Sequence, residues 1–270
     1  SEQSRTLIIP PIPDGDYINL EAPVQLLDGF RMQGFGKPSR FFLRTFPEPC
    51  FIVTGQVDVS GLSFAGYPTR TVTSTHYASI VRDQYWYLNH VGVLCLSGSD
   101  GSSIRDIRGE DIDMTVAAWG YDVDAEEYGG NIAGLNIQGI RGERVWAAVF
   151  WREVDNISVR DVIAVDIRQV GDEPDEAPAH AIYCTSTGAI LPEERYMRGG
   201  YVNNVQAWNT AAVAPPPGGA GGSSAFSFKY LTGAHISDLT AKNCNGLMDI
   251  NSLQDCVVEN VIGIDDRCTL

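Results

Sequence analysis

A six-residue pattern that recurs seven times restricts the fold of this chain more than any other feature of the sequence. It consists of an aliphatic residue, two spacers, a second aliphatic residue, one further spacer and, in most copies, a small residue. The copies occupy residues 59–64, 104–109, 137–142, 159–164, 202–207, 236–241 and 258–263, with starts 45, 33, 22, 43, 34 and 22 residues apart. Repetition at this period predicts a solenoid, in which each turn buries its apolar face on its neighbours.

Each copy alternates like a strand, breaks at a corner, and then alternates again. The corner positions carry the residues Gly61, Asp106, Gly139, Asp161, Asn204, Asp238 and Asn260. Gly, Asn and Asp are typical of tight corners, and the sequence lacks the longer 3.6-residue periodicity of a helical solenoid. The sequence therefore predicts an all-β solenoid of bent strand pairs, with about 22 residues per turn and the longer gaps filled by inserted loops or a second turn.

Length and composition agree with one soluble domain. We expect a single elongated solenoid over residues 1–270, because the chain is long enough for one such core. Residues 1–16 are rich in proline and predict an irregular lead-in. The chain opens at Ser1 without an initiator methionine, as in a mature or trimmed form. No apolar stretch approaches the roughly 20 residues that a membrane helix needs.

The net charge and the cysteines narrow the choice of partners and cofactors. A net charge of −15 disfavours nucleic acid and anionic membranes, because both attract lysine and arginine. The even number of cysteines, six, permits disulfides in a secreted protein. No pair has CxxC spacing, so a zinc site is not expected. Cys184 and Cys256 lie in strand-like runs and are interpreted as small core residues.

The opening of the chain carries a family resemblance. The segments Gly15-Asp-Tyr-Ile-Asn-Leu20 and Phe30-Arg-Met-Gln-Gly-Phe-Gly36 precede the repeated pattern. Together they resemble the pectate-lyase-like superfamily over about residues 15–265. The resemblance implies a single-stranded right-handed parallel β-helix. The superfamily includes polysaccharide lyases, glycoside hydrolases, epimerases, tailspikes and adhesins, so the architecture leaves the reaction open.

Two better-known sets of catalytic signatures of that superfamily are missing from this sequence. The Arg-x-Pro-x-x-Arg pattern of pectate lyases does not occur, nor do the Asn-Thr-Asp, Gly-His-Gly and Arg-Ile-Lys patterns of polygalacturonases. No catalytic residue can therefore be transferred, and the site has to be argued from the residues themselves.

A further strand is expected seven or eight residues before each of the later copies of the pattern. Aligning these strands by their distance to the pattern predicts that Trp151, Phe228 and Ile250 point inward. The same alignment predicts two outward columns. One contains Phe150, Ser227 and Asp249, and the other contains Arg152, Lys229 and Asn251. Tyr183 and Thr185 are placed in the intervening turn of these columns. Stacked strands lie about 4.8 Å apart, so neighbouring members of a column can contact one sugar.

Inserted loops flank this strand column. Residues 117–130, 169–179 and 212–224 precede the strands, and residues 186–199 follow one of them. Solenoids often use such insertions at a binding face, and loops on both sides would form a groove for an extended glycan. The alternative is that the loops are decoration. The third loop holds three prolines followed by glycines, which is typical of a lid or a subunit contact.

Two of the loops carry chemistry. The first contains Asp122, Asp124 and Glu126 between Tyr121 and Tyr128. This spacing is a weak candidate for a Ca²⁺ site, and a solvated acidic loop is the favoured alternative, so no cofactor is expected. The second loop contains the densest set of possible acids and bases, which consists of Asp172, Glu173, Asp175, Glu176 and then His180.

Two reactions fit these residues. Glycoside hydrolysis needs two carboxyl groups, and Asp249 with an acid of the second loop, or with Glu153, would supply them. A lyase needs a base and a cation, for which Lys229 and Arg152 are candidates, with Tyr183 or His180 assisting. The acidic net charge favours the hydrolase slightly. For substrate binding we expect stacking on exposed Trp119 and Tyr121, and contacts from Tyr183, Glu153, Asn251 and Ser227.

The sequence thus predicts a secreted or extracellular enzyme that degrades a polysaccharide. The main alternative is a non-catalytic β-helix that binds a glycan or receptor, such as a tailspike component or adhesin, which would suit a homotrimer on a virion. A weaker alternative is an isomerase or cyclase with a small-molecule substrate. Geometry distinguishes the first two, because an enzyme needs two facing ionisable groups, whereas a binder needs exposed aromatic residues and hydrogen-bond partners.

Overall fold

A computed structural model describes residues 6–13, 16–43, 49–66, 90–122, 127–128, 132–167, 179–185, 196–210 and 224–264. These residues form strands joined by turns, and none of them is helical. Accordingly, the described part of the chain holds no helix that could cross a membrane.

The strands of the first half of the chain are β1 (Thr6–Ile8), β2 (Ile18–Leu20), β3 (Val24–Leu26), β4 (Arg31–Gln33), β5 (Arg40–Leu43), β6 (Phe51–Val53), β7 (Asp58–Ser60), β8 (Ser63–Ala65), β9 (Val91–Cys95), β10 (Ser103–Arg105), β11 (Arg108–Glu110), β12 (Met114–Trp119), β13 (Tyr121–Asp122) and β14 (Glu127–Tyr128). Those of the second half are β15 (Ile132–Ala133), β16 (Asn136–Glu143), β17 (Ala147–Arg152), β18 (Val154–Asp155), β19 (Ser158–Val165), β20 (His180–Thr185), β21 (Met197–Arg198), β22 (Tyr201–Trp208), β23 (Ser224–Thr232), β24 (His235–Lys242), β25 (Gly246–Gln254) and β26 (Val257–Ile264).

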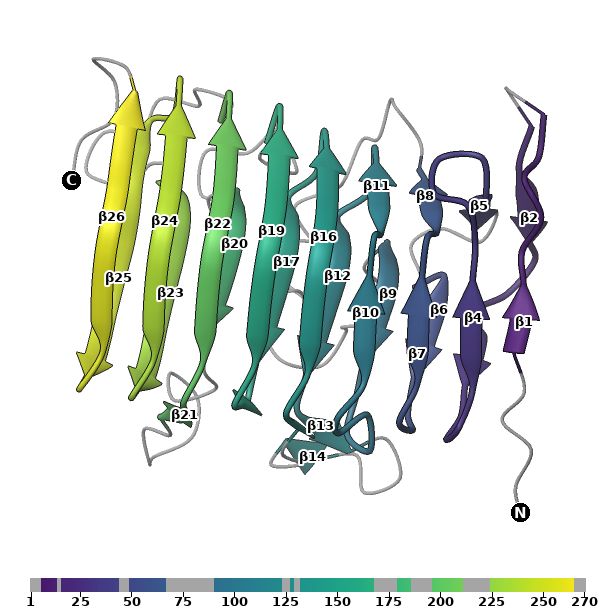
Figure 1. The fold of residues 1–270 in the computed structure, drawn as a ribbon, viewed down its shortest axis with the longest axis horizontal. Coiled ribbons are helices and arrows are strands. Elements are labelled where there is room, and N and C mark those ends of the chain that lie inside the picture. Colours follow the sequence, from purple (N-terminus) through teal and green to yellow (C-terminus); the bar gives the residue numbers. More distant parts are fainter. Residues whose placement is uncertain are drawn as a thin grey trace.

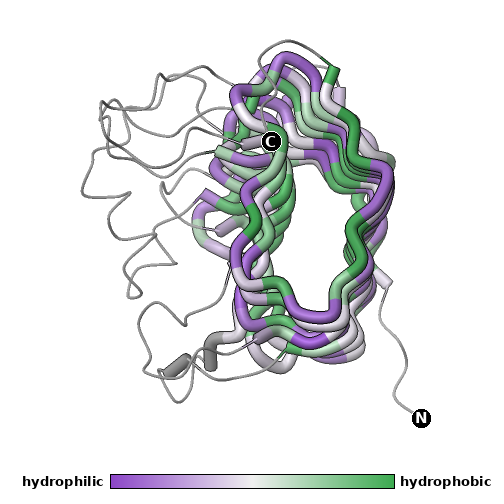
Figure 2. The backbone as a smooth tube through the Cα atoms, turned by 90° about the vertical axis from the view of Figure 1, so that its left-hand side faces the viewer, coloured by the Kyte–Doolittle hydropathy of each residue, from purple (hydrophilic) through white to green (hydrophobic). Residues whose placement is uncertain are grey.

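Two long sheets of parallel strands run the length of the molecule. A 13-stranded sheet, called here the repeat sheet, contains every strand of the repeated pattern. A 9-stranded sheet, called here the companion sheet, contains β3, β6, β9, β12, β17, β20, β23, β25 and β21. The strands stack in chain order from β1 to β26 (Figure 1), and the view along the stack shows successive turns superposed (Figure 2). This all-β arrangement of parallel strands is compatible with a β-helix.

The register of the repeat sheet follows the predicted alignment of the seven pattern copies. The first aliphatic residues of the copies pair in one continuous row, which consists of Val59, Ile104, Ile137, Val159, Val202, Ile236 and Val258. Each has at most a small exposed fraction except Val258, which lies on the last strand. The repeat therefore stacks as predicted, whereas the right-handed sense, the 22-residue turn and membership of the superfamily stay predictions.

The corner inside each pattern copy adopts the backbone conformation that its residues predicted. All seven corner residues have a positive φ, between 53° at Asn260 and 69° at Gly139. This left-handed region is sterically unfavourable for most L-residues and is tolerated by Gly, Asn and Asp. The corner is thus encoded locally, by a residue that can bend the strand at little cost.

The small residue that closes six of the seven pattern copies also has a steric reason, whereas the first copy closes with Phe64. A Cβ added to Gly109 would lie 2.4 Å from Thr115 Oγ1, and one added to Gly142 would lie 3.0 Å from the Cβ of Ala148. Thr115 lies on β12 and Ala148 on β17, so Gly109 and Gly142 pack directly against the companion sheet. In later turns the row holds buried alanines, Ala164, Ala207 and Ala241.

The core fills the space between the sheets, and its inward column is exposed at the end of the stack. Trp151, Cys184 and Phe228 of the companion sheet pair in register and are fully buried, whereas Ile250 on β25 is 49% exposed. The sequence predicted these inward positions correctly. Cys95, Cys184 and Cys256 are free thiols. Burial raises the pKa of the Cys95 thiol to about 12.

The region predicted as an irregular lead-in, residues 1–16, contains one short strand among its described residues. Thr6–Ile8 forms β1, which pairs in parallel with Arg31–Gln33 of β4 and so extends the repeat sheet. A strand this short gives little periodic signal in sequence, and pairing with a neighbouring turn supplies the hydrogen bonds that define it.

Candidate active site

The companion sheet places the predicted site residues in two outward columns, as expected. Phe150, Tyr183, Ser227 and Asp249 pair in one column across β17, β20, β23 and β25. Arg152 pairs with Thr185, and Lys229 pairs with Asn251, in the column next to it. The parallel register sets these side chains one strand spacing apart, and this confirms the placement of Tyr183 and Thr185.

Exposure varies steeply along the two columns. Phe150, Arg152 and Ser227 are buried although they point away from the core. Tyr183, Thr185, Lys229 and Asp249 are half-buried, and Asn251 is exposed. The accessible part of the columns therefore lies on β20, β23 and β25, toward the end of the stack.

Asp249 and Lys229 form an ion pair at this accessible end. Lys229 Nζ lies 2.8 Å from Asp249 Oδ2, and Ser227 Oγ donates a hydrogen bond to the same oxygen at 3.2 Å. Burial by itself raises the pKa of Asp249, but the hydrogen bond and charge of Lys229, together with Ser227, outweigh it, so the pKa is lowered. Burial likewise opposes the charge of Lys229, and Asp249 again outweighs it and raises the pKa of Lys229.

His180 lies buried at the start of β20 in a fixed tautomer. Its Nδ1 is 2.7 Å from the carbonyl oxygen of Ser224, which can only accept, so Nδ1 carries the proton. Burial lowers the pKa of His180 to about 4, so the imidazole is neutral near neutral pH. Its ring centroid lies 5.0 Å from that of Tyr183.

An aromatic cluster supports these polar groups from the preceding turns. Phe150 packs against Trp119, Trp146 and Tyr183 with ring centroids 5.4, 6.0 and 5.4 Å away. Lys229 Nζ lies 5.7 Å from the centroid of the Tyr183 ring, within the range of a cation–π contact. Such packing holds the rings in one arrangement, so Tyr183 and Lys229 present a fixed surface beside Asp249.

Besides Ser227 and His180, three predicted site residues are less accessible than expected. Trp119 is 2% exposed, so the prediction that it is an exposed stacking residue was wrong. It closes β12, where the guanidinium of Arg152 from the next turn lies 5.6 Å from its ring centroid. Arg152 and Glu153 are themselves buried. Because all three are buried, a substrate on the described surface would contact other residues first.

Several predicted site residues lie outside the described residues. These are Asp172, Glu173, Asp175 and Glu176 of the second loop, and Asp124 and Glu126 of the first. Tyr121 and Asp122 belong to β13, which pairs with β14 in antiparallel fashion, but the description does not extend to their side chains. Within the described residues no group of three or more His, Cys, Asp or Glu side chains is arranged to hold a metal ion, and the Ca²⁺ site stays an untested prediction.

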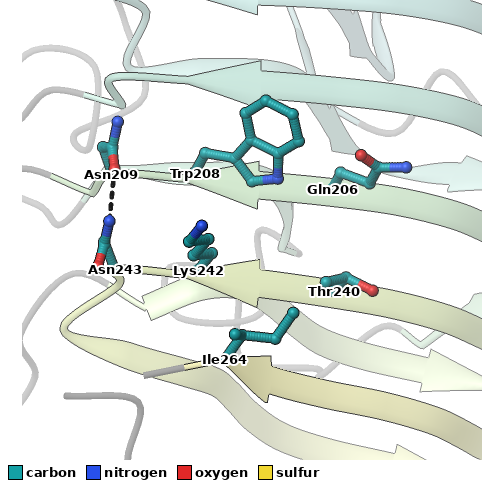
Figure 3. A pocket seen from close by; sticks show the side chains of 7 residues that line it. All are labelled: Gln206, Trp208, Asn209, Thr240, Lys242, Asn243 and Ile264. Atoms are coloured by element: carbon teal, nitrogen blue, oxygen red, sulfur yellow. Dashed lines mark hydrogen bonds between the residues drawn. The ribbon is translucent and has the colours of Figure 1, made fainter. Parts of the chain in front are cut away.

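A second concave surface, which the sequence did not single out, lies on the repeat sheet. It is a pocket of about 550 Å³ (Figure 3), lined by Gln206, Trp208, Asn209, Thr240, Lys242, Asn243 and Ile264. Trp208 is 40% exposed. A signal for it existed, because strand alternation after the corner at Asn204 puts Val205 and Ala207 inside and Trp208 outside.

Comparison with known proteins adds little to the geometry. No protein-family model and no curated protein matched the sequence. One similar solved structure is DFA-IIIase from Arthrobacter chlorophenolicus A6 in complex with GF2, with 12% identity, a TM-score of 0.33, and coverage of 87% of this chain and 77% of that one. Another is the catalytic unit of a thermostable GH87 alpha-1,3-glucanase from Streptomyces thermodiastaticus strain HF3-3, with 10% identity, a TM-score of 0.29, and coverage of 99% and 66%. Similarity at this level carries no argument about the reaction.

Proposed function

We propose that this protein is a glycoside hydrolase that binds an extended glycan along β20, β23 and β25, with Asp249 as its ionised carboxylate. The observation that carries the proposal is the arrangement around Asp249 Oδ2, where Lys229 Nζ at 2.8 Å and Ser227 Oγ at 3.2 Å both donate. These contacts keep Asp249 ionised near neutral pH and fix its orientation, while the half-buried carboxylate remains open to solvent.

An ionised, oriented carboxylate is one of the two groups that glycoside hydrolysis requires. With Oδ2 bound by Lys229 and Ser227, Oδ1 is the oxygen available to activate a water molecule or to attack the sugar. The second group is a protonated carboxyl on the other side of the scissile bond. We assign it to the loop of residues 169–179, whose four acids precede β20 in the sequence.

The same ion pair disfavours the lyase alternative. A lyase base must accept a proton, and the raised pKa of Lys229 keeps this residue protonated. Its positive charge is also matched by Asp249, which reduces its attraction for a uronate carboxylate. His180 is neutral near neutral pH, but only 1% of the residue is exposed, so it fits a role in positioning Tyr183 and β20.

The substrate would contact the surface next to Asp249. Tyr183 and Thr185 on β20 and Asn251 on β25 are the partly or fully exposed members of the two columns. A partly exposed tyrosine ring offers an apolar face to a sugar, and the amide and hydroxyl groups offer hydrogen bonds. An extracellular location and a homotrimer stay predictions from the sequence.

Product analysis with one variant and one matched control tests the proposal. The protein is incubated with a panel of neutral and uronate polysaccharides, and products are detected as reducing ends and by the ultraviolet absorbance of unsaturated uronates. We expect reducing ends without that absorbance, and a loss of at least about 100-fold in kcat for Asp249→Asn. The control is Glu259→Gln, which removes an exposed carboxylate paired with His235 on the repeat sheet and should leave kcat unchanged.

Other outcomes would replace the proposal. Reducing ends together with the uronate absorbance would show a lyase. Glycan binding without any product would favour the non-catalytic alternative. Equal activity of the wild type and Asp249→Asn would move the reaction to a different site, whatever the products.

A further inference from the structure

The outer face of the repeat sheet changes character along the stack. In the turns of β8, β11 and β16 its second half is covered by ion pairs. Arg40 contacts Glu110 at 2.8 Å, Arg108 contacts Glu143 at 2.8 Å, and Arg144 contacts Asp111 at 2.8 Å. Each of these charged side chains pairs with an opposite charge in another turn, so this part of the face presents few unpaired charges to a ligand.

The charged rows end after β16. The row that begins with Glu110 and Glu143 continues in register as Val165, Trp208, Lys242 and Ile264. The neighbouring row, which begins with Arg108 and Arg141, continues as Ile163, Gln206, Thr240 and Ile262. Over the four turns from β19 to β26 the face thus changes from paired charges to an aromatic and aliphatic surface with isolated polar groups, and the pocket lies on this surface.

Trp208, on β22, lies between Asn209 and Gln206, and the two asparagines lie together at one side of the pocket (Figure 3). Asn243 Nδ2 donates to Asn209 Oδ1 at 3.1 Å, and Asn209 Nδ2 donates to Asp166 Oδ1 at 3.0 Å. All three residues have a positive φ between 52° and 58°, so the backbone and the hydrogen bonds both fix the amides. Among the described residues, none donates to Asn243 Oδ1, which leaves it as an oriented acceptor.

From this arrangement we propose that the Trp208 pocket is a second carbohydrate-binding site, which holds pyranose units of a glycan against the indole ring. A pyranose has an apolar face of C–H groups and a rim of hydroxyls. The indole and Ile264 suit the apolar face, and the amides, the Thr240 hydroxyl and the Lys242 ammonium suit the rim. A volume of about 550 Å³ lies in the range of small-ligand pockets and accommodates a short oligosaccharide.

This site is separate from the one around Asp249. It lies on the repeat sheet, whereas Asp249 lies on β25 of the companion sheet, and the described residues that line it include no carboxylate. It would therefore bind a glycan without cleaving it, and it stands whether or not Asp249 is catalytic.

The test uses the full chain carrying Asp249→Asn, so that bound sugars are not turned over. Oligosaccharides of glucose, galactose, mannose, xylose and galacturonic acid are titrated by calorimetry and by the indole N–H signals in NMR. The signal of Trp208 is assigned by its disappearance in Trp208→Phe. We expect one class of sugar to shift this signal, and Trp208→Ala to raise its Kd at this site at least tenfold, while Trp208→Phe keeps most of the affinity.

Tyr201 provides a matched control on the same strand. It is 39% exposed, nearly as much as Trp208, but lies on the other side of the corner at Asn204. Tyr201→Ala should leave the affinity unchanged, and thermal unfolding of each variant checks that the fold is retained. The proposal is overturned if no sugar of the panel binds, if binding leaves the Trp208 signal unmoved, or if Trp208→Ala binds as tightly as the parent. Product formation by the chain with Asp249 intact is measured separately, so failure of one proposal does not count against the other.

Discussion

The corner row of the repeat sheet never places two carboxylates in adjacent turns. In chain order its residues are Gly61, Asp106, Gly139, Asp161, Asn204, Asp238 and Asn260. Asn204 separates two of the aspartates and donates from Nδ2 to Asp161 Oδ1 at 2.8 Å, while Asp238 stands opposite it in the next turn. Stacked strands are about 4.8 Å apart, so we predict that Asn204→Asp destabilises the fold through like-charge repulsion.

The size of this effect follows from the geometry. Two unit charges about 4.8 Å apart repel by about 0.9 kcal/mol in water, and the substitution creates two such contacts, about 1.7 kcal/mol in total. Loss of the hydrogen bond to Asp161 adds about 1 kcal/mol. Asn260 is the matched comparison, because it donates to Asp238 at 3.1 Å but has one carboxylate neighbour among the described residues. Asn260→Asp should therefore be less destabilising by about 0.9 kcal/mol.

Urea unfolding measures both variants at low and at high salt. Physiological salt screens charges over about 8 Å, so the repulsive part should fall by about half there, and below the ordinary pKa of aspartate it should vanish. The hydrogen bond from Asn204 to Asp161 predicts the same direction of pH dependence for the difference in unfolding free energy between wild type and variant. Hydrogen bonds from Asn204 and Gln138 lower the pKa of Asp161, so its stabilising contribution is present above the unfolded pKa and is lost as pH falls through the folded one. Equal free-energy losses for the two variants, or losses independent of salt, would refute this reasoning.

Two further predictions concern the companion sheet. Phe228 is fully buried, so Phe228→Ala should lower the free energy of unfolding by about 3–5 kcal/mol. Ile250 lies in the same column but is 49% exposed, so Ile250→Ala should lower it far less. Equal losses for the two variants in urea unfolding would contradict the predicted inward column. Lys229 lowers the pKa of Asp249, so in Lys229→Met the acidic limb of the pH–activity profile should move to higher pH, and an unmoved limb would separate Asp249 from the reaction.

The parts of the fold that the sequence predicted are those that depend on local rules. Alternation places side chains inside or outside a strand, and this was enough to align Trp151 with Phe228 and Asp249 with Ser227 before any register was known. A corner needs a residue that tolerates a positive φ, and Gly, Asn or Asp occupies every one of the seven. Both rules act within a few residues, so a single sequence contains them.

The parts that the sequence did not predict depend on neighbouring turns. Trp119 points outward as its position in β12 requires, but Arg152 of the next turn lies over it, so its accessibility is set by a residue 33 positions away in the chain. The ion pair of Lys229 with Asp249 also joins two turns, and nothing within either strand fixes its geometry. The direction in which a side chain points from its strand can be read from the sequence. Its exposure and its interaction partners depend on the residues of the neighbouring turns.

Both candidate sites lie in the later turns of the stack, and there is a physical reason for this location. In a solenoid the inward residues have to pack, so the outward residues of each turn are the ones free to vary. In the turns of β8, β11 and β16 they are committed to ion pairs such as Arg40 with Glu110. From β19 to β26 the same rows of the repeat sheet hold the exposed Trp208 instead, and on the companion sheet Asp249 is paired with Lys229 but keeps 41% of its side chain exposed. Among the described residues, the exposed groups of both candidate sites therefore lie on the turns from β19 to β26.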